Sequence, residues 1–359
     1  MSRGMRVLSS FSSFFSSCCS HSPLSSSCSP SPLFSSSFTL ACSFSSCSSS
    51  AIQTRIIDGK KIANDIIEEV KREAEIFHSQ KGIKCGISTI VVGDRHDSNI
   101  YVERKIQMAQ KCGFRANEIR FPASITQQQL IHSIQSLNSS PSTHAILLQL
   151  PLPPHLNQHR ILSEISEKKN VDGLSVDNFG RLALEGVAEG EKGGREGKRE
   201  ENDTPSPLLP CTPAAVLEIL ERESVSLEGK RVVVVGKSAI VGLPLSLSLL
   251  SHRATVTVCH RKTKNLQEII KQGEIVITAA GSPKLIKGNW LSPGAVVVDV
   301  GVNEVTSQEQ HQQQQKRRVV GDVDFDSAIG VAGLLTPVPG GVGPLTIAML
   351  MKNVLFLAK

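Results

Sequence analysis

Apolar residues recur along most of the chain in an alternation typical of helices followed by buried strands. From about Ile56, apolar side chains at helical spacing in a charged stretch predict an amphipathic helix, and the apolar run Cys85–Gly93 predicts a buried strand. A cap on Asp97 or Ser98 is expected to open the next helix, which ends near Cys112. The first half should also contain strands near 119–121 and at 145–150 and a helix at 126–137.

The same alternation continues after residue 210. Pro213 suits the first turn of a helix that reaches about Arg222, and residues 344–358 predict a last apolar helix that packs back on the first half of the chain. Strands are expected at 231–236, 254–259, 274–279 and 295–300, with helices at 240–250 and 265–271. Strands that alternate with helices indicate βαβ units, so we expect an α/β fold of mainly parallel sheets, with 359 residues sufficing for two domains.

The first fifty residues differ in composition from the rest of the chain. Of these, 23 are Ser and none is Asp or Glu, while Arg3 and Arg6 are the only charged residues apart from His21. This composition is typical of an organelle transit peptide, whereas a secretory signal needs an unbroken apolar stretch. We therefore expect residues 1–55 to be a leader to a matrix or stroma. The early Arg residues slightly favour the mitochondrion, while the Ser content suits the chloroplast.

Two later stretches contain few apolar residues and are expected to be surface loops. Gly186–Pro207 is rich in Gly, Glu, Lys and Arg and lies near the expected domain junction, and Thr306–Arg318 contains a run of Gln. No stretch has about 18 consecutive apolar residues, so a membrane span is not expected.

The overall composition favours a soluble globular protein that binds small anionic ligands. The net charge of +6 comes from basic residues spread along the chain, and aromatic residues make up only 4%, so stacking platforms for nucleic acid are scarce. Outside the leader, Cys85, Cys112, Cys211 and Cys259 lie far apart without a CxxC pair. We interpret them as reduced and mostly structural, and we expect neither a disulfide framework nor a metal site.

A dinucleotide-binding turn is the first candidate for chemistry. The strand at 231–236 runs into Gly236-Lys-Ser-Ala-Ile-Val-Gly242 and then into a helix. Backbone N–H groups at such a turn can bind a pyrophosphate, although a phosphate-free turn of an α/β protein is an equal alternative. NAD-binding units usually carry a carboxylate about 20 residues after this turn, where this chain has Arg261 and Lys262, and Lys237 lies in the turn itself. These cations suit the extra phosphate of NADP unless they belong to a solvated basic loop.

A second set of candidates lies in four other segments. Tyr101 and Lys105 are four residues apart and share a helix face, where a ring and an amine could stack on a flat heterocycle and move protons. Gln149 follows a buried strand, and Asp172 lies on a turn within Val171-Asp-Gly173. The loop Thr336–Pro344 consists largely of Gly and Pro, so its backbone could approach a flat ligand closely. Taken singly, each segment also has an ordinary structural explanation.

Taken in order, these segments resemble the bifunctional methylenetetrahydrofolate dehydrogenase/cyclohydrolase family, in a plant- or alga-like organellar form. The resemblance covers about residues 56 to 359 and rests on motifs at Tyr101–Lys105, Leu147–Pro153, Val171–Gly173, Pro210–Pro213, Gly236–Pro244, Asp299–Asn303, Gly321–Phe325 and Thr336–Pro344. It implies oxidation of methylenetetrahydrofolate with NADP, hydrolysis of the methenyl product to 10-formyltetrahydrofolate, and a homodimer formed through the cofactor domain.

The resemblance also implies roles for particular residues. Lys105 would serve the hydrolytic step, and Gln149 would form a hydrogen bond to Lys105 and tune the reactivity of its amine. Tyr101 would stack on the folate and Asp172 would bind the pterin. The folate would further contact Val102, Leu148, Leu150, Pro339, Gly340, Gly341, Val342 and Gly343. NADP would contact Gly236, Lys237, Ser238, Arg261 and Val302.

The implied organisation is an N-terminal α/β catalytic domain and a Rossmann-type NADP-binding domain. The catalytic domain would span 56–185 and 335–359, and the cofactor domain 208–334, with a low-complexity insertion at 186–207. The family often has Arg at the position of Lys237 and a small hydroxyl residue at that of Arg261, which bears on the choice between NADP and NAD. No synthetase domain follows Lys359, so a formyl-ligase activity is not expected.

Two rival hypotheses fit the same resemblance. A monofunctional dehydrogenase would have lost the hydrolytic step, and a non-catalytic folate-binding protein would have lost both. The presence of Lys105, Gln149 and Asp172 argues against either loss.

Overall fold

A computed structural model describes residues 52–188, 207–307 and 316–359. The predicted transit peptide therefore lies outside the described residues, apart from 52–55, and so does most of the predicted insertion. All the described residues belong to one compact unit. Among the described residues, no helix combines the length and the apolarity needed to cross a membrane.

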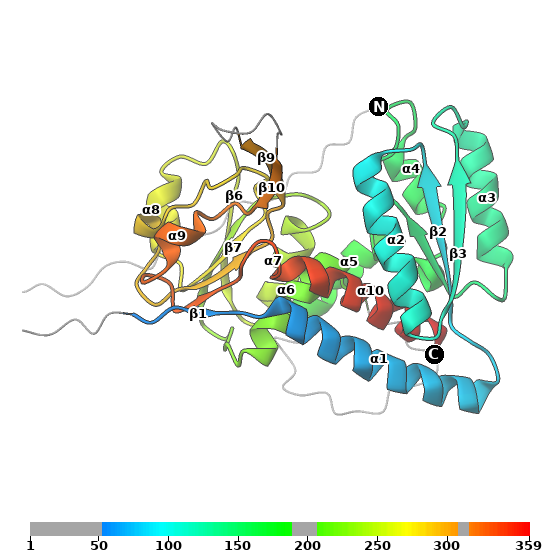
Figure 1. The fold of residues 1–359 in the computed structure, drawn as a ribbon, viewed down its shortest axis with the longest axis horizontal. Coiled ribbons are helices and arrows are strands. Elements are labelled where there is room, and N and C mark those ends of the chain that lie inside the picture. The colour runs from blue at the N-terminus through cyan, green and yellow to red at the C-terminus, as the bar shows by residue number, and fades with distance from the viewer. Residues whose placement is uncertain (1–51, 189–206, 308–315) are drawn as a thin grey trace, which may run out of the picture. The chain divides into compact units, whose positions relative to one another are not determined.

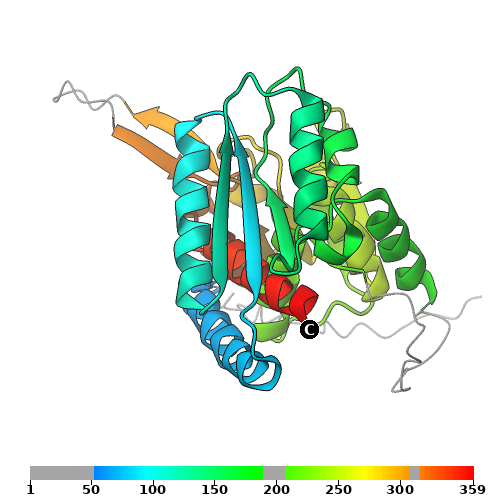
Figure 2. The same ribbon diagram turned by 90° about the vertical axis from the view of Figure 1, so that its right-hand side faces the viewer.

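A three-stranded parallel sheet forms the first half, in the order β3-β2-β4. Its strands are β2 (Gly86–Val92), β3 (Arg115–Phe121) and β4 (Ala145–Leu148). Alternate side chains of a strand point to opposite faces, so Ile87 and Leu147 pack with the first and last helices, Gly59–Lys81 and Val342–Ala358, while Ile90 and Leu148 pack with the helices Gln127–Ser139 and Gln158–Ser163. The helices of this half are α1 (Gly59–Lys81), α2 (His96–Lys111), α3 (Gln127–Ser139) and α4 (Gln158–Ser163) (Figures 1 and 2).

A six-stranded parallel sheet forms the second half, in the order β1-β11-β8-β7-β5-β6. Its strands are β1 (Arg55–Ile56), β5 (Arg231–Val235), β6 (Thr255–Cys259), β7 (Ile275–Thr278), β8 (Val296–Asp299) and β11 (Leu334–Leu335). The chain moves from β5 to β6 on one side and then to β7 on the other, so the order reverses beside β5. In doubly wound sheets, ligands bind at the carboxyl ends of the strands at such a reversal.

The last helix, α10 (Val342–Ala358), joins the two halves. It packs on α1, on β2 and β4, and on α6 (Cys211–Arg222), which leads into the second sheet (Figure 1). One apolar cluster consequently includes Ile87 of the first sheet, Val234 of the second and Leu350 of α10. The predicted parallel α/β architecture and the return of the last helix are both confirmed.

Several local predictions were incomplete or wrong. Residues 306–307 and 316–318 were expected to be loop, but they lie in an antiparallel hairpin of β9 (Asn303–Ser307) and β10 (Lys316–Val320). Val and Thr residues on both sides of the Gln run favour strands, and each pairs with an Arg, Glu or Asn on the other strand. The segment 308–315 lies outside the described residues. Helix α5 (Val176–Ala188) was not predicted and takes in residues 186–188 of the expected insertion. Helix α2 begins at His96 with Arg95 as its N-cap, so neither Asp97 nor Ser98 opens it.

Helices α7 (Gly242–Ser251) and α8 (Leu266–Lys271) agree with the predictions to within a few residues, whereas the short α9 (Phe325–Ala328) was not predicted. Pro213 lies in the first turn of α6, as expected. Strand β3 begins four residues before the predicted start because its outward-facing residues are charged, which hides the alternation.

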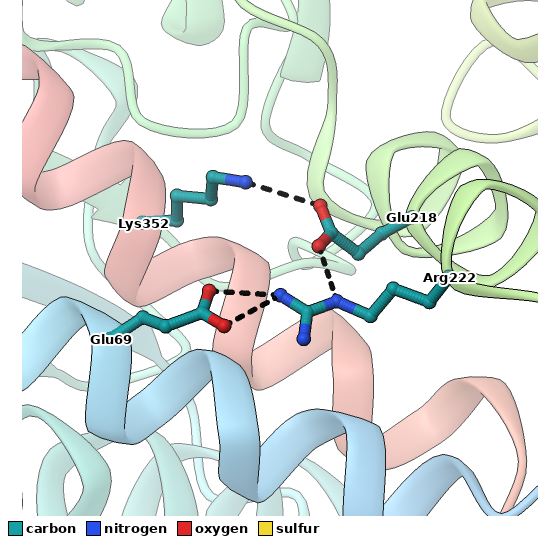
Figure 3. Close-up of polar contacts among 4 residues, drawn as sticks. All are labelled: Glu69, Glu218, Arg222 and Lys352. Atoms are coloured by element: carbon teal, nitrogen blue, oxygen red, sulfur yellow. Dashed lines mark hydrogen bonds and ion pairs between the residues drawn. The ribbon is translucent and has the colours of Figure 1, made fainter.

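A network of four charged side chains links α1, α6 and α10 (Figure 3). The Arg222 guanidinium donates to both oxygens of Glu69, at 3.0 and 2.8 Å, and to Glu218 Oε1 at 2.8 Å. Lys352 Nζ donates to Glu218 Oε2 at 3.1 Å. Burial acts to raise the pKa of Glu218, but the hydrogen bonds and charges of Arg222 and Lys352 outweigh it and hold that pKa below its ordinary value.

Removal of Arg222 should therefore destabilise the fold. We expect Arg222→Ala to lower the free energy of unfolding by about 2 kcal/mol at pH 7, because Glu218 loses one of two partners while it stays buried. The loss should shrink as the pH falls below the ordinary Glu value of 4.5, since protonated Glu218 no longer needs the cation. Chemical denaturation at several pH values measures both effects.

The exposed pair of Lys111 and Glu68, 3.8 Å apart and each 52% exposed, provides the control. Lys111→Ala should cost less than about 0.5 kcal/mol. An equal cost for the two substitutions would show that the Figure 3 network adds nothing to stability.

Candidate active site

A cavity of about 280 Å³ opens between the carboxyl end of β4 and helices α6 and α10. Six of the predicted site residues line it together, namely Tyr101, Lys105, Leu148, Gln149, Leu150 and Asp172. The rest of its lining consists of Leu174, Pro210, Cys211, Thr212, Ile240, Thr346 and Leu350. Residues more than 240 positions apart in the chain thus meet at one site.

Lys105 and Gln149 form the polar pair of the cavity. Lys105 lies on α2 and its Nζ donates to Gln149 Oε1 at 3.0 Å. The backbone N–H of Gln149 donates to Ile90 O at 2.9 Å, which continues the β2–β4 ladder, and its Nε2 donates to Leu150 O at 2.8 Å. Because Leu150 engages the amide nitrogen, the amide oxygen faces the lysine. Tyr101 lies one turn before Lys105, and its side chain is 40% exposed.

Asp172 lines the same cavity from a tight turn. Gly173 has a φ of 62°, and a Cβ there would approach Leu208 O to 2.5 Å, so this turn requires glycine. The Cys211 thiol donates to Asp172 Oδ1 at 3.6 Å. Burial raises the pKa of Asp172, opposed by the charge of Lys105 and the thiol hydrogen bond. Burial, reinforced by the charge of Asp172, raises the pKa of Cys211 well above its ordinary value, so the thiol remains a donor at neutral pH.

Several lining residues were not anticipated from the sequence. Cys211 was interpreted as structural, and it is a free thiol that contacts a candidate site carboxylate. Thr346 and Leu350 belong to a helix whose apolar sequence predicts core packing alone. Ile240 comes from the dinucleotide turn and brings that turn to the cavity wall. Two signals were available for Cys211, namely its position at the start of a predicted helix and its place in the Pro210–Pro213 motif.

The glycine-rich loop before α10 packs against the start of α1. A Cβ on Gly59 would lie 2.0 Å from Gly341 O, and a Cβ on Gly341 would lie 2.6 Å from Pro337 O. Gly340 has a φ of 108°. The predicted folate contacts Pro339 to Gly343 and the fully buried Val102 are not among the residues that line the cavity. The loop instead leads directly into Thr346 and Leu350, which do line it.

The dinucleotide turn packs closely against neighbouring backbone, which requires glycine at two of its positions. Gly236 has a φ of 139°, and a Cβ there would lie 2.3 Å from Ala279 O. A Cβ on Gly242 would lie 1.9 Å from Gly236 O. Ser238 Oγ accepts from the N–H of Val241 at 3.1 Å and so closes the turn. The exposed Lys237 and Arg261 follow β5 and β6, which pair in register, so the two residues share one edge of the sheet.

Two buried carboxylates hold the neighbouring loops at this edge. Asp322 accepts from the N–H groups of Ala280, Gly281 and Ser282 at 2.6 to 3.2 Å. Asp299 accepts from three further backbone N–H groups and from the Thr278 hydroxyl. Burial raises the pKa of Asp299 to about 6. The exposed Val302 follows Asp299 at the same edge. Within the described residues, no group of His, Cys, Asp or Glu could hold a metal ion.

Comparison with known proteins agrees with this arrangement. Residues 57–172 match the model of the tetrahydrofolate dehydrogenase/cyclohydrolase catalytic domain, and residues 210–359 match that of the NAD(P)-binding domain. The chain belongs to the tetrahydrofolate dehydrogenase/cyclohydrolase family. The bifunctional protein FolD 2 of Arabidopsis thaliana is 45% identical over 307 residues, which cover 85% of this chain and 96% of the relative. A bifunctional FolD of Zymomonas mobilis is 42% identical over 299 residues, covering 83% and 94%.

Solved structures of the family have the same fold. The methylenetetrahydrofolate dehydrogenase-cyclohydrolase of Trypanosoma brucei, solved with NADP and an inhibitor, aligns with a TM-score of 0.76 at 38% identity. It covers 85% of this chain and 97% of its own. The Campylobacter jejuni FolD enzyme aligns with a TM-score of 0.75 at 38% identity and covers 85% and 98%.

Proposed function

We propose that this protein oxidises 5,10-methylenetetrahydrofolate to 5,10-methenyltetrahydrofolate with NADP and then hydrolyses the product to 10-formyltetrahydrofolate. Family membership and the names of its bifunctional relatives support this proposal. The observation that carries the hydrolytic half is the hydrogen bond between Lys105 and Gln149 inside the cavity. A monofunctional dehydrogenase would have no need to keep an amine oriented there.

In the hydrolytic step, Lys105 would transfer protons as water adds to the methenyl carbon and the ring opens. Gln149 would hold the Lys105 amine through its Oε1 and keep it aimed into the cavity. Tyr101 would stack on the folate and Asp172 would bind the pterin, which suits a partly buried carboxylate beside a cation. Leu148 and Leu150 would line the folate site, with Val102 beneath it, and the loop from Pro339 to Gly343 would close over the ligand.

The position of the dinucleotide turn supports NADP binding, because the turn follows β5 at the carboxyl edge of the sheet, beside the reversal of strand order where doubly wound sheets bind ligands. Gly236 and Ser238 would contact the pyrophosphate. Lys237 and Arg261 would contact the additional phosphate, and Val302 would contact the remainder of the cofactor. When bound, NADP would accept the hydride from the methylene group. In this step the protein would position the folate near the dinucleotide turn. Ile240 of that turn lines the folate cavity, so the two binding sites adjoin.

Substitution of Lys105 separates the two activities. We expect Lys105→Ala to lower the cyclohydrolase rate of the full chain by about 100-fold or more, since general acid–base groups contribute roughly that much. Reduced cofactor should still form and the methenyl absorbance should persist, because hydride transfer does not use the amine. Lys111→Ala, on the exposed end of the same helix, should leave both rates unchanged.

The same assay tests the function itself. Turnover of methylenetetrahydrofolate with NADP and then decay of the methenyl absorbance is the expected result for the wild type, with slower turnover with NAD. Reduction of cofactor without that decay would identify a monofunctional dehydrogenase. No turnover with either cofactor would favour a folate-binding protein. Undiminished hydrolysis by Lys105→Ala would overturn the role of that lysine.

We further propose a homodimer formed through β6. This strand ends the six-stranded sheet, so its outer edge is unpaired among the described residues, and its Val258 is 42% exposed. Leu250 of the adjacent α7 is 52% exposed. Val258→Arg should convert a dimer into a monomer in light scattering, whereas Val319→Arg on the hairpin should not. A wild-type monomer at micromolar concentration would contradict this assembly.

We also propose an organellar location and the domain division given above. The Ser-rich, acid-free composition of the first fifty residues supports import, with the mitochondrion ahead of the chloroplast. A fluorescent protein fused after residue 55 should enter one of these organelles, and a cytosolic fusion would contradict the proposal. The catalytic domain would comprise 56–185 and 335–359, and the cofactor domain 208–334. Strand β1, residues 55 and 56, spans the start of this division and pairs with β11 of the cofactor sheet.

A further inference from the structure

We propose that Asn353 of α10 is a positioning residue that holds the Asp172 turn and the Cys211 segment together on the wall of the folate cavity. This inference rests on the proposed function. Asn353 is only 7% exposed, and its amide nitrogen has three acceptors within reach. It donates to Val171 O at 3.1 Å and to Leu209 O at 3.3 Å, and it contacts Cys211 Sγ at 3.7 Å.

Each of these acceptors is close in sequence to a residue of the cavity. Val171 precedes Asp172 directly, and Leu209 is two residues before Cys211. The Asn353 amide therefore bridges the two backbones whose side chains meet in the contact of the Cys211 thiol with Asp172. A change in the separation of these backbones would move the Asp172 carboxylate relative to Lys105, whose charge acts on it.

A second buried amide joins the same two segments at a neighbouring point. Asn178 of α5 donates to Gly173 O and to Leu208 O, both at 2.7 Å, and accepts from the Leu208 N–H at 2.8 Å. The two asparagines differ in what they connect to the segments. Asn178 connects them to α5, whereas Asn353 connects them to the helix that lines the cavity.

The spacing along α10 explains why Asn353 acts on the site. Thr346, Leu350 and Asn353 are separated by four and three residues, so they lie along one helix face. Thr346 and Leu350 line the cavity, and Asn353 continues that face to the Asp172 turn. A helix that fits against the folate at one end thus fixes the folate-binding carboxylate at the other.

Asn353→Ala and Asn353→Ser, each in the full chain, test this role. Loss of two hydrogen bonds from a buried amide should raise the KM for methylenetetrahydrofolate about tenfold in Asn353→Ala, while the KM for NADP stays unchanged. Serine retains a donor hydroxyl and should restore part of the loss. Val354→Ala is the matched control, because it removes fully buried apolar atoms from the next position without touching the turn.

Alkylation of Cys211 by iodoacetamide, followed by mass spectrometry, provides a measurement that needs no turnover. We expect Cys211 to be labelled severalfold faster in Asn353→Ala than in the wild type. It should also be labelled severalfold faster than in Val354→Ala when the two variants have lost the same amount of thermal stability. An unchanged folate KM with unchanged labelling, or equal changes in Val354→Ala, would overturn the positioning role. If the wild type showed no turnover but Cys211 were labelled faster in Asn353→Ala, the proposed function would be overturned. The positioning of the Cys211 segment by Asn353 would still be supported.

Discussion

The rotation of α10 about its own axis is fixed by a few polar contacts, and the cavity depends on it. The helix is apolar on nearly all sides, so packing in the shared core stabilises it but gives little preference for one rotation. Between Leu345 and Ala358 its polar side chains are Thr346, Lys352 and Asn353. Lys352 binds Glu218, which Arg222 ties to α1, and Asn353 binds the Asp172 turn. The buried Asn353 and the contact of Lys352 with the buried Glu218 therefore favour one rotation of the helix over the others.

The carboxyl ends of parallel strands supply the other constraint on the sites. Gln149 follows β4, and Gly236 and Arg261 follow β5 and β6, so each candidate group leaves its sheet at the same kind of edge. The loops there have backbone N–H groups without ladder partners, and buried carboxylates satisfy them. Asp322 and Asp299 accept six such N–H groups between them and stabilise the edge without protruding into it. The exposed surface of this edge remains available to a ligand.

The sequence predicted the sheet-forming segments well because buried parallel strands are continuous apolar runs. Runs such as Arg231–Val235 need no knowledge of their neighbours. Helix α5 and the β9–β10 hairpin were missed because their residues are mixed or charged, and tertiary pairing decides their structure. The partners Lys105, Gln149 and Asp172 could be singled out by residue type, but their meeting in one cavity depends on folding. Cys211 and Asn353 could not be singled out, since their side chains resemble those of ordinary core positions until their partners are known.

The proposed reactions act on a single carbon of the folate, so both sets of groups must reach it. Lys105 on one wall and Ile240 of the dinucleotide turn on another line the same cavity of about 280 Å³. A ligand placed there has the amine on one side and the cofactor turn on the other. The methenyl product of oxidation would thus form already beside the groups that hydrolyse it. This geometry explains why a protein with two reactions can need only one folate site, and why the helix that bounds this site is held to both halves of the chain.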